Sequence, residues 1–258
     1  MGGLTVLKEL RKQLPSEATI YLGDEARMPY GPRPASEVLE FTRQAMQWLA
    51  SRDCKLIVIA CNTATSAALE TVRDEMNVPI IGVVRPGAAA AIAASQRRAI
   101  GVLATAGTVR SGAYIRAVRD LDPFCDVTQQ PCPKLVPIVE EGKAGTPEAL
   151  AAVREYVEPL LTEGAVVTPA VDTLLLGCTH YPLLREEFAK VAGPAVRVVD
   201  SATTTALAVR EVLVSHRLLA GPSHPAHEVY ATGPVDRFRS VARAIFREDV
   251  PVESTTLA

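Results

Sequence analysis

The sequence has few aromatic residues and no surplus of charge of either sign. Phe, Trp and Tyr make up 5% of the 258 residues, and 27 Lys and Arg residues face 29 Asp and Glu residues, which gives a formal net charge of −2. This balance provides no broad basic surface, so we expect no nucleic-acid partner. No run of about 18 uncharged apolar residues occurs, so no membrane span is expected. The first residues also lack the basic and apolar regions of a signal peptide, which favours a soluble cytoplasmic protein.

Cysteine and histidine are too few and too poorly spaced for a disulfide framework or a zinc site. The five cysteines are odd in number, and in a reducing compartment we expect free thiols. Their spacings are not those of zinc ligands. His224 and His227 lie in a stretch rich in Gly, Pro and Ser, so we interpret them as loop residues. The glycine patterns of Rossmann folds and P-loops are also absent. The sequence therefore predicts no metal and no nucleotide cofactor.

Hydrophobic residues make up 48% of the chain, enough for a substantial core, and they follow an alternating order. Short apolar runs predict strands at residues 18–22, 55–59, 79–83, 99–103, 174–176, 196–199 and 228–231. Longer periodic stretches predict helices that include residues 36–51, 66–76, 87–94, 112–120, 147–163 and 203–217. Strands that alternate with helices favour parallel βαβ units, and the continuous Ile, Val and Leu runs favour sheets covered on both faces.

The order of the elements predicts two similar parallel-sheet α/β lobes. The first lobe is expected to comprise residues 1–84 and 206–258, and the second residues 85–205. The last segment carries a helix, a strand and another helix, which we expect to pack back onto the first lobe. In such folds a ligand binds beyond the carboxyl ends of the strands, so we expect the active site between the two lobes.

Two cysteines follow equivalent apolar runs, Cys61 after residues 55–60 and Cys178 after residues 172–177. Each precedes a segment typical of the first turn of a helix, whose N-terminus favours negative charge, so we expect a lowered pKa for Cys61. His180 can hold a charge or pass a proton near Cys178. Either cysteine alone would more often be an inert core residue. Their shared strand-end position favours a pair that removes a proton from one face of a carbon and returns one to the other.

Two other strand ends are polar. Residues 101–111 form a strand, a Gly/Thr turn and a helix start, whose N–H groups and Thr hydroxyls could cradle a carboxylate. Ordinary turn chemistry explains the same pattern. After the strand at 18–22, Asp24 and Arg27 are predicted to form a structural ion pair.

The residues around the two cysteines resemble a known family. Cys61-Asn62-Thr63-Ala64 and Gly177-Cys178-Thr179-His180-Tyr181-Pro182 are similar to the two signature motifs of glutamate racemases, within the cofactor-independent aspartate/glutamate racemase superfamily. Further matching segments are Tyr21-Leu22-Gly23-Asp24, Pro29-Tyr30-Gly31, residues 104–109, residues 136–140, Asp200-Ser201 and Thr232-Gly233. The resemblance runs from Gly2 almost to the C-terminus.

The resemblance implies two α/β lobes with pseudo-two-fold symmetry and an enzyme that interconverts L- and D-glutamate without pyridoxal phosphate or metal. It implies that Cys61 and Cys178 are the two acid/base groups, and that His180 and Glu140 assist them. The substrate contacts that it implies are Tyr30, Gly31, Asn62, Thr63, Thr179 and His180, together with Thr105 and Thr108. It further implies a supply of D-glutamate for peptidoglycan and a possible homodimer.

The chain departs from the family at its start. Family members usually begin with a short strand that ends in Asp-Ser-Gly-x-Gly-Gly-Leu-Thr-Val, whereas this sequence begins Met1-Gly2-Gly3-Leu4-Thr5-Val6. Loss of the strand would leave neighbouring backbone groups of the first lobe unpaired. The Asp of the family's Asp-Ser pair, which assists a cysteine, is also missing from this sequence. One hypothesis is a misassigned start, because the family often has valine at the position of Met1 and a valine codon can start translation in bacteria. With Met1 as the true start we expect weak or no activity.

Two alternatives stay open. One is a racemase of aspartate or another amino acid, although the segment Thr179-His180-Tyr181-Pro182 favours glutamate. The other is a non-catalytic protein, a regulatory or inactive N-terminally truncated form of the enzyme. Catalysis requires that Cys61→Ala or Cys178→Ala abolish racemisation, whereas a binding role would survive both changes.

Overall fold

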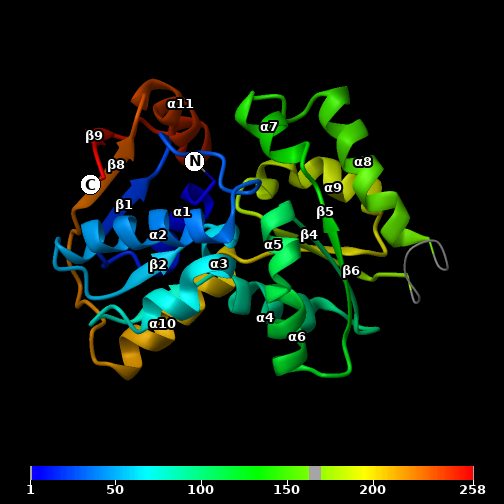
Figure 1. Ribbon diagram of the computed structural model, residues 1–258, viewed down its shortest axis with the longest axis horizontal. Coiled ribbons are helices and arrows are strands. Elements are labelled where there is room, and N and C mark those ends of the chain that lie inside the picture. The colour runs from blue at the N-terminus through cyan, green and yellow to red at the C-terminus, as the bar shows by residue number, and fades with distance from the viewer. Residues whose placement is uncertain (1, 163–169, 258) are drawn as a thin grey trace. The chain divides into compact units, whose positions relative to one another are not determined.

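A computed structural model describes residues 2–162 and 170–257 of the chain (Figure 1). The chain forms two compact units: the first comprises Met1–Val83 and Ala202–Ala258, and the second Val84–Ser201. Every strand pairing among the described residues is parallel, and helices separate most successive strands. The predicted class, a parallel α/β protein with two lobes, is confirmed.

The first unit has its strands in two separate sheets, ordered β1-β8-β9 and β2-β3. The strands are β1 (Thr19–Gly23), β2 (Ile57–Ile59), β3 (Ile80–Gly82), β8 (His227–Thr232) and β9 (Glu253–Thr255). The helices are α1 (Leu4–Gln13), α2 (Ala35–Ala50), α3 (Asn62–Arg73), α10 (Ala202–Ser215) and α11 (Val235–Phe246). His227, predicted to be in a loop, begins β8, where its ring contacts the hydroxyl of Thr19 on β1.

The second unit has one four-stranded sheet, ordered β5-β4-β6-β7. Its strands are β4 (Ala99–Ala104), β5 (Asp126–Pro131), β6 (Thr173–Gly177) and β7 (Arg197–Asp200). Its helices are α4 (Val84–Ala94), α5 (Ala106–Ser111), α6 (Ala113–Leu121), α7 (Leu135–Glu140), α8 (Pro147–Leu161), the 3-10 helix η1 (Tyr181–Leu184) and α9 (Arg185–Ala192). The last residue of the predicted helix 147–163 lies outside the described residues.

Alternating side chains of β6, a central strand of the second unit, pack into two different hydrophobic cores, each formed with its own set of helices. Leu174 and Leu176 of β6 join a core formed with α7, α8 and α9. Leu175, between them, joins the core formed with α4 and α6. Period-two alternation with both faces apolar produces the unbroken apolar run seen in the sequence. Polar groups of these strands are therefore confined to their ends.

The two units differ in the continuity of their sheets. In the second unit β4, the first strand, lies between β5 and β6. In the first unit the first two strands, β1 and β2, belong to different sheets. Among the described residues no strand pairs with both of them. A Cβ on Gly3, just before α1, would lie 2.9 Å from the Tyr21 Oη and 3.1 Å from the Ala60 Cβ. The start of α1 thus lies close to the side chain of Tyr21, in the middle of β1, and to that of Ala60, just after β2.

Several elements differ from the sequence-based expectation. Helix α3 begins at Asn62, not at residue 66, because Cys61 caps it, so the Asn and Thr residues that favour caps lie inside the first turn. Helix α4 begins at Val84, three residues before the predicted start. Strands β5 and β9 were not predicted, because β5 is largely polar and β9 is three residues long.

A buried carboxylate fixes the beginnings of β4 and β6. Asp172 precedes β6, and its oxygens accept hydrogen bonds from the Ser95 Oγ at 2.6 Å and from the N–H groups of Gln96 and Arg97 at 2.8 and 2.7 Å. Its own N–H donates to the Ala99 carbonyl at 3.0 Å. Burial by itself raises the pKa of Asp172, but these hydrogen bonds outweigh burial and lower it.

The substitution Asp172→Asn should lower the free energy of unfolding by about 1–3 kcal/mol at pH 7, because an amide NH2 would face backbone donors. The lowered pKa means that the carboxylate's contribution is complete above the unfolded-state pKa of about 3.9 and is lost as the pH falls below it. In urea unfolding, the difference in the free energy of unfolding between wild type and variant should stay constant down to about pH 4. Below that pH the difference should become smaller. Asp120→Asn, at an exposed position of α6, is the control. Equal stability of the Asp172 and Asp120 variants would contradict the role of this carboxylate.

Candidate functional site

In the first unit Cys61 lies between the end of β2 and the first turn of α3. It is the N-cap residue, and its Sγ accepts the N–H of Ala64 at 3.5 Å. Thr65 holds this turn in place, because its Oγ1 donates to the Ile59 carbonyl at 2.9 Å and accepts the N–H of Val83 at 3.3 Å. The ends of β2 and β3 therefore set the position of the sulfur.

The electrostatics of Cys61 correct the sequence-based expectation. Burial raises the pKa of the Cys61 thiol, and the N–H groups of Ala64 and Thr63, which favour the thiolate, offset only part of this effect. The prediction of a lowered pKa was wrong because the local sequence shows the helix N-terminus but not the burial. The raised pKa favours the thiol over the thiolate at Cys61 and makes the thiolate a stronger base.

Other predicted residues of the first unit lie around this turn. Asn62 and Thr63 are buried in the first turn of α3. Tyr30 packs against the same apolar cluster as Cys61, and Gly31 follows it in the loop after β1. The predicted ion pair between Asp24 and Arg27 is confirmed, with a distance of 2.7 Å between Asp24 Oδ2 and Arg27 Nε.

In the second unit Cys178 begins a chain of three ionisable side chains. It directly follows β6 and is 6% exposed. Its Sγ lies 3.7 Å from the Nδ1 of His180, and the Nε2 of His180 lies 2.6 Å from the Oε1 of Glu140, the last residue of α7. A carboxylate on one ring nitrogen orients the imidazole, so the other nitrogen faces the sulfur and can exchange a proton with it.

Close packing behind Cys178 fixes the backbone that carries it. A Cβ on Gly177 would lie 2.9 Å from the ring of Tyr114 and 3.0 Å from the Leu103 carbonyl oxygen, so only glycine fits there. After the cysteine the chain turns into η1, with a proline in its first turn, and the Tyr181 hydroxyl donates to the Cys132 carbonyl at 3.1 Å.

The turn after β4 adds two threonines to the same sheet edge. Thr105 caps α5, and its Oγ1 accepts the N–H of Thr108 at 3.4 Å and lies 3.1 Å from the Thr108 Oγ1. Because Ala104 pairs with Gly177, Thr105 and Cys178 follow paired residues of adjacent strands. The structure therefore brings these groups to one edge of the sheet.

The predicted site residues are divided between the two units. The first unit holds Cys61, Asn62, Thr63, Tyr30 and Gly31, and the second holds Cys178, Thr179, His180, Glu140, Thr105 and Thr108. Sequence reasoning gave no role to Thr232, whose hydroxyl binds Asp24, because 208 positions separate the two. All five cysteines are free. No group of three or more His, Cys, Asp or Glu side chains suited to a metal occurs in the part of the chain that the structure describes.

Comparison with known proteins agrees with this arrangement. The model of the Asp/Glu/Hydantoin racemase family matches residues 3–209. The chain belongs to this racemase family. The matched residues include both Cys61 and Cys178.

Individual racemases match over nearly the whole length of the chain. A protein from Lactiplantibacillus plantarum named glutamate racemase is 45% identical over 245 residues, which cover 94% of this chain and 88% of the relative. The crystal structure of glutamate racemase isoform RacE1 from Bacillus anthracis superposes with a TM-score of 0.94 at 37% identity, covering 99% of this chain and 94% of that one. That of glutamate racemase from Francisella tularensis, solved with D-glutamate, gives a TM-score of 0.88 at 29% identity, with 99% and 93% coverage.

The raised pKa of Cys61 predicts slow alkylation at neutral pH. The rate of iodoacetamide labelling at Cys61, followed by mass spectrometry, should rise with pH. The midpoint of this rise should lie above about pH 8.5, which is the pKa of an exposed cysteine. In urea the midpoint should return to that value, and Cys61→Ser identifies the labelled peptide. A midpoint below 8.5 in the folded protein would mean that the helix N-terminus outweighs burial.

Proposed function

We propose that this racemase interconverts L- and D-glutamate, with Cys61 and Cys178 as its two acid/base groups. The observation that carries the proposal is the equivalent place of the two thiols. Each follows the carboxyl end of a parallel strand: Cys61 comes after β2 and caps α3, and Cys178 comes after β6 and lies three residues before the 3-10 helix η1. Relatives that match nearly the whole chain at 41–45% identity are named glutamate racemases, which supports the substrate.

In the proposed reaction one cysteine acts as a thiolate and takes the proton from Cα, so that a C–H bond breaks and an S–H bond forms. The other cysteine, as a thiol, gives its proton to the opposite face of the same carbon. The product has the inverted configuration, and the roles exchange for the reverse direction. A thiol with a raised pKa suits both roles, because it stays protonated as the acid and is strongly basic once deprotonated.

The neighbouring residues take supporting roles in this proposal. His180, backed by Glu140, exchanges or holds a proton at Cys178, as the 3.7 Å and 2.6 Å contacts allow. At Cys61 the N–H groups at the start of α3 stabilise the thiolate. The proposed substrate contacts are Tyr30, Gly31, Asn62, Thr63, Thr105, Thr108, Thr179 and His180. Hydroxyl, amide and backbone N–H groups of this kind suit the carboxylates and ammonium of an amino acid.

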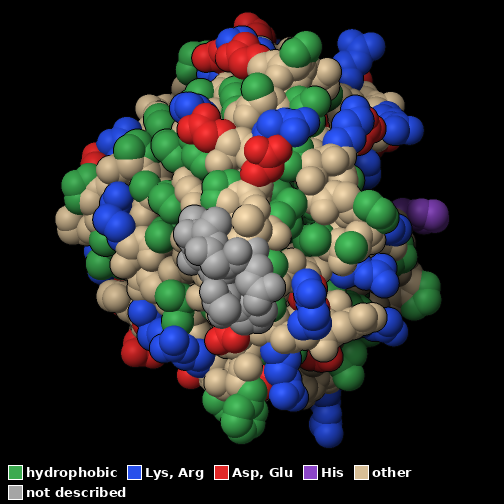
Figure 2. Space-filling model, turned by 90° about the vertical axis from the view of Figure 1, so that its right-hand side faces the viewer, with side chains coloured by type: hydrophobic (Ala, Val, Ile, Leu, Met, Phe, Trp, Pro, Cys, Tyr) green, Lys and Arg blue, Asp and Glu red, His purple; other side chains and the backbone are tan. Residues whose placement is uncertain are grey.

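The proposed setting is the cytoplasm, where D-glutamate would supply peptidoglycan synthesis, with glutamate as the partner and a homodimer as the assembly. None of the described helices has the length and hydropathy to cross a membrane. On the face drawn in Figure 2, Lys and Arg side chains are scattered among acidic and apolar ones over the described atoms. This pattern supports a small-molecule substrate more than a nucleic acid.

A weakly active or regulatory protein is the second candidate. The interrupted sheet of the first unit favours it, because β1 and β2 each lack a strand partner on one edge among the described residues. Cys61 directly follows this region, so imprecise positioning of the sulfur would slow proton transfer.

The two-base mechanism predicts the fate of the Cα hydrogen. In deuterated water, product formed by the wild type should carry solvent deuterium at Cα. Cys61→Ser and Cys178→Ser should each lower the racemisation rate roughly a hundredfold or more, because a hydroxyl is a far poorer acid/base group than a thiol. Cys54→Ser, a change at a half-buried cysteine, should leave the rate unchanged. Retention of the original hydrogen through many turnovers would instead indicate a single base.

A further inference from the structure

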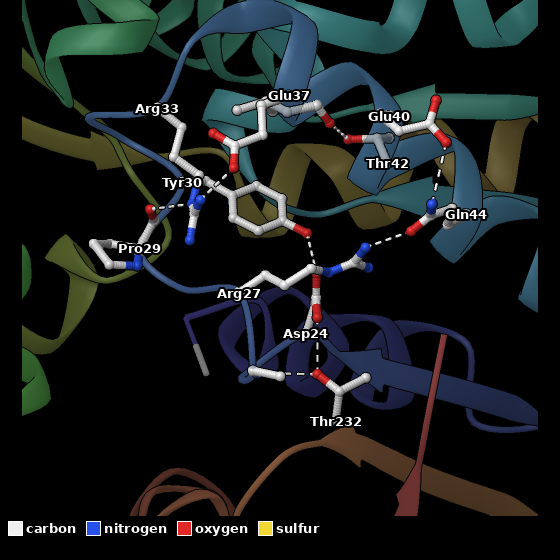
Figure 3. Close-up of polar contacts among 12 residues, drawn as sticks. Asp24, Arg27, Pro29, Tyr30, Arg33, Glu37, Glu40, Thr42, Gln44 and Thr232 are labelled. Carbon is white, nitrogen blue, oxygen red and sulfur yellow. Dashed lines mark hydrogen bonds and ion pairs between the residues drawn. The ribbon is translucent and has the colours of Figure 1, made fainter. Parts of the chain in front are cut away.

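The carboxylate of Asp24 is the centre of a polar network in the first unit (Figure 3). Asp24 directly follows β1, and its side chain is 9% exposed. Its Oδ2 accepts hydrogen bonds from the Arg27 Nε at 2.7 Å and from the Tyr30 hydroxyl at 2.5 Å, while its Oδ1 accepts the Thr232 hydroxyl at 2.8 Å. One carboxylate therefore fixes three side chains, two of them in the loop that leads to Gly31.

Thr232 ties this loop to the end of β8. Its hydroxyl donates to Asp24 and accepts the N–H of Ala26 at 3.0 Å, so both of its hydrogen-bonding roles are used. The register explains the contact, since Gly23 pairs with Ala231 and the next residues of the two strands are neighbours. Gly233 has a φ of +73°, and a Cβ there would lie 3.3 Å from the backbone of Ala26. The two backbones thus pack directly on each other.

Helix α2 holds the other side of the loop. The Arg27 guanidinium donates to Gln44 and lies 4.2 Å from the centre of the Phe41 ring. The ring of Tyr30 packs against the same Phe41, with centroids 5.8 Å apart. Tyr30 is therefore held at both ends, by Phe41 at its ring and by Asp24 at its hydroxyl.

This arrangement limits what Tyr30 can offer a substrate. Burial and the nearby charge of Asp24 raise the pKa of the Tyr30 phenol, so the group stays protonated as the donor to Asp24. The hydroxyl is committed inside the protein. The Tyr30 carbonyl accepts the N–H of Arg33 at 3.1 Å, so we expect the loop to contact a ligand through the remaining backbone groups at Tyr30 and Gly31.

We propose that Asp24 is a positioning residue, which acts through Thr232, Arg27 and Tyr30 to hold the backbone of Tyr30 and Gly31 in the conformation that binds glutamate. The proposal rests on the proposed function for the identity of the ligand. The contacts that fix the loop are independent of it.

The first test needs no activity. Amide hydrogen exchange of the peptide that covers residues 24–33 should be faster in Asp24→Asn and in Thr232→Val, which removes both contacts of the hydroxyl without a change of size. Thr232→Ser keeps the hydroxyl and should exchange like the wild type. Asp236→Asn, at a 94% exposed side chain of α11, controls for the loss of a negative charge. Unchanged exchange in both disruptive variants would overturn the proposal.

The second test is kinetic. Asp24→Asn and Thr232→Val should raise the KM for both enantiomers of glutamate by about tenfold, because a displaced binding loop loses contacts made in ground and transition states alike. The kcat and its pH profile should change less than about twofold, since neither thiol is altered. Thr232→Ser should restore most of the affinity. An unchanged KM in variants with a mobile loop, or an equal loss in Thr232→Ser, would contradict the role in binding.

The two tests separate the two claims. A wild-type protein that does not racemise glutamate would contradict the proposed function, while the exchange experiment would still decide whether Asp24 fixes the loop.

Discussion

A parallel sheet covered by helices on both faces must bury its strand side chains and satisfy its backbone groups within the sheet. In the second unit this constraint makes the middle of β4 and β6 entirely apolar. Polar chemistry is left only to the strand ends, where Thr105 and Cys178 follow paired residues. The same rule places Asp24 beside Thr232 in the first unit. In both units the polar groups at the strand ends are placed by the pairing of the buried strands.

Burial also affects how Cys61 can act. A thiol that is withdrawn from water resists ionisation, and at Cys61 the helix N-terminus compensates for only part of that cost. The proposed reaction uses this balance, because each sulfur must be an acid in one direction and a base in the other. The polar neighbours of the two sulfurs differ. The Cys61 sulfur accepts a backbone N–H at the start of α3, whereas the Cys178 sulfur lies beside His180, which in turn contacts Glu140.

The sequence was sufficient for the features that depend on local pattern. Apolar runs located β2, β4 and β6, and both cysteines follow such strands in the structure as the sequence predicted. The ion pair of Asp24 and Arg27 was also predictable, because the two residues are three positions apart.

Features that depend on distant residues were not predictable. The contact between Asp24 and Thr232 requires the pairing of β1 with β8, which no local pattern encodes. The pKa direction at Cys61 depends on the surroundings of the folded chain. The edge strand β5 was missed because an exposed edge can be polar, and α3 began earlier than expected because a cysteine served as its cap.

The most direct test of the central claim is the circular dichroism of L-glutamate incubated with the purified chain and no added cofactor. The signal should decay to zero as the L and D enantiomers equilibrate, and Cys61→Ser and Cys178→Ser should each slow the decay roughly a hundredfold or more. A constant signal with folded wild-type protein would contradict glutamate racemisation by this chain.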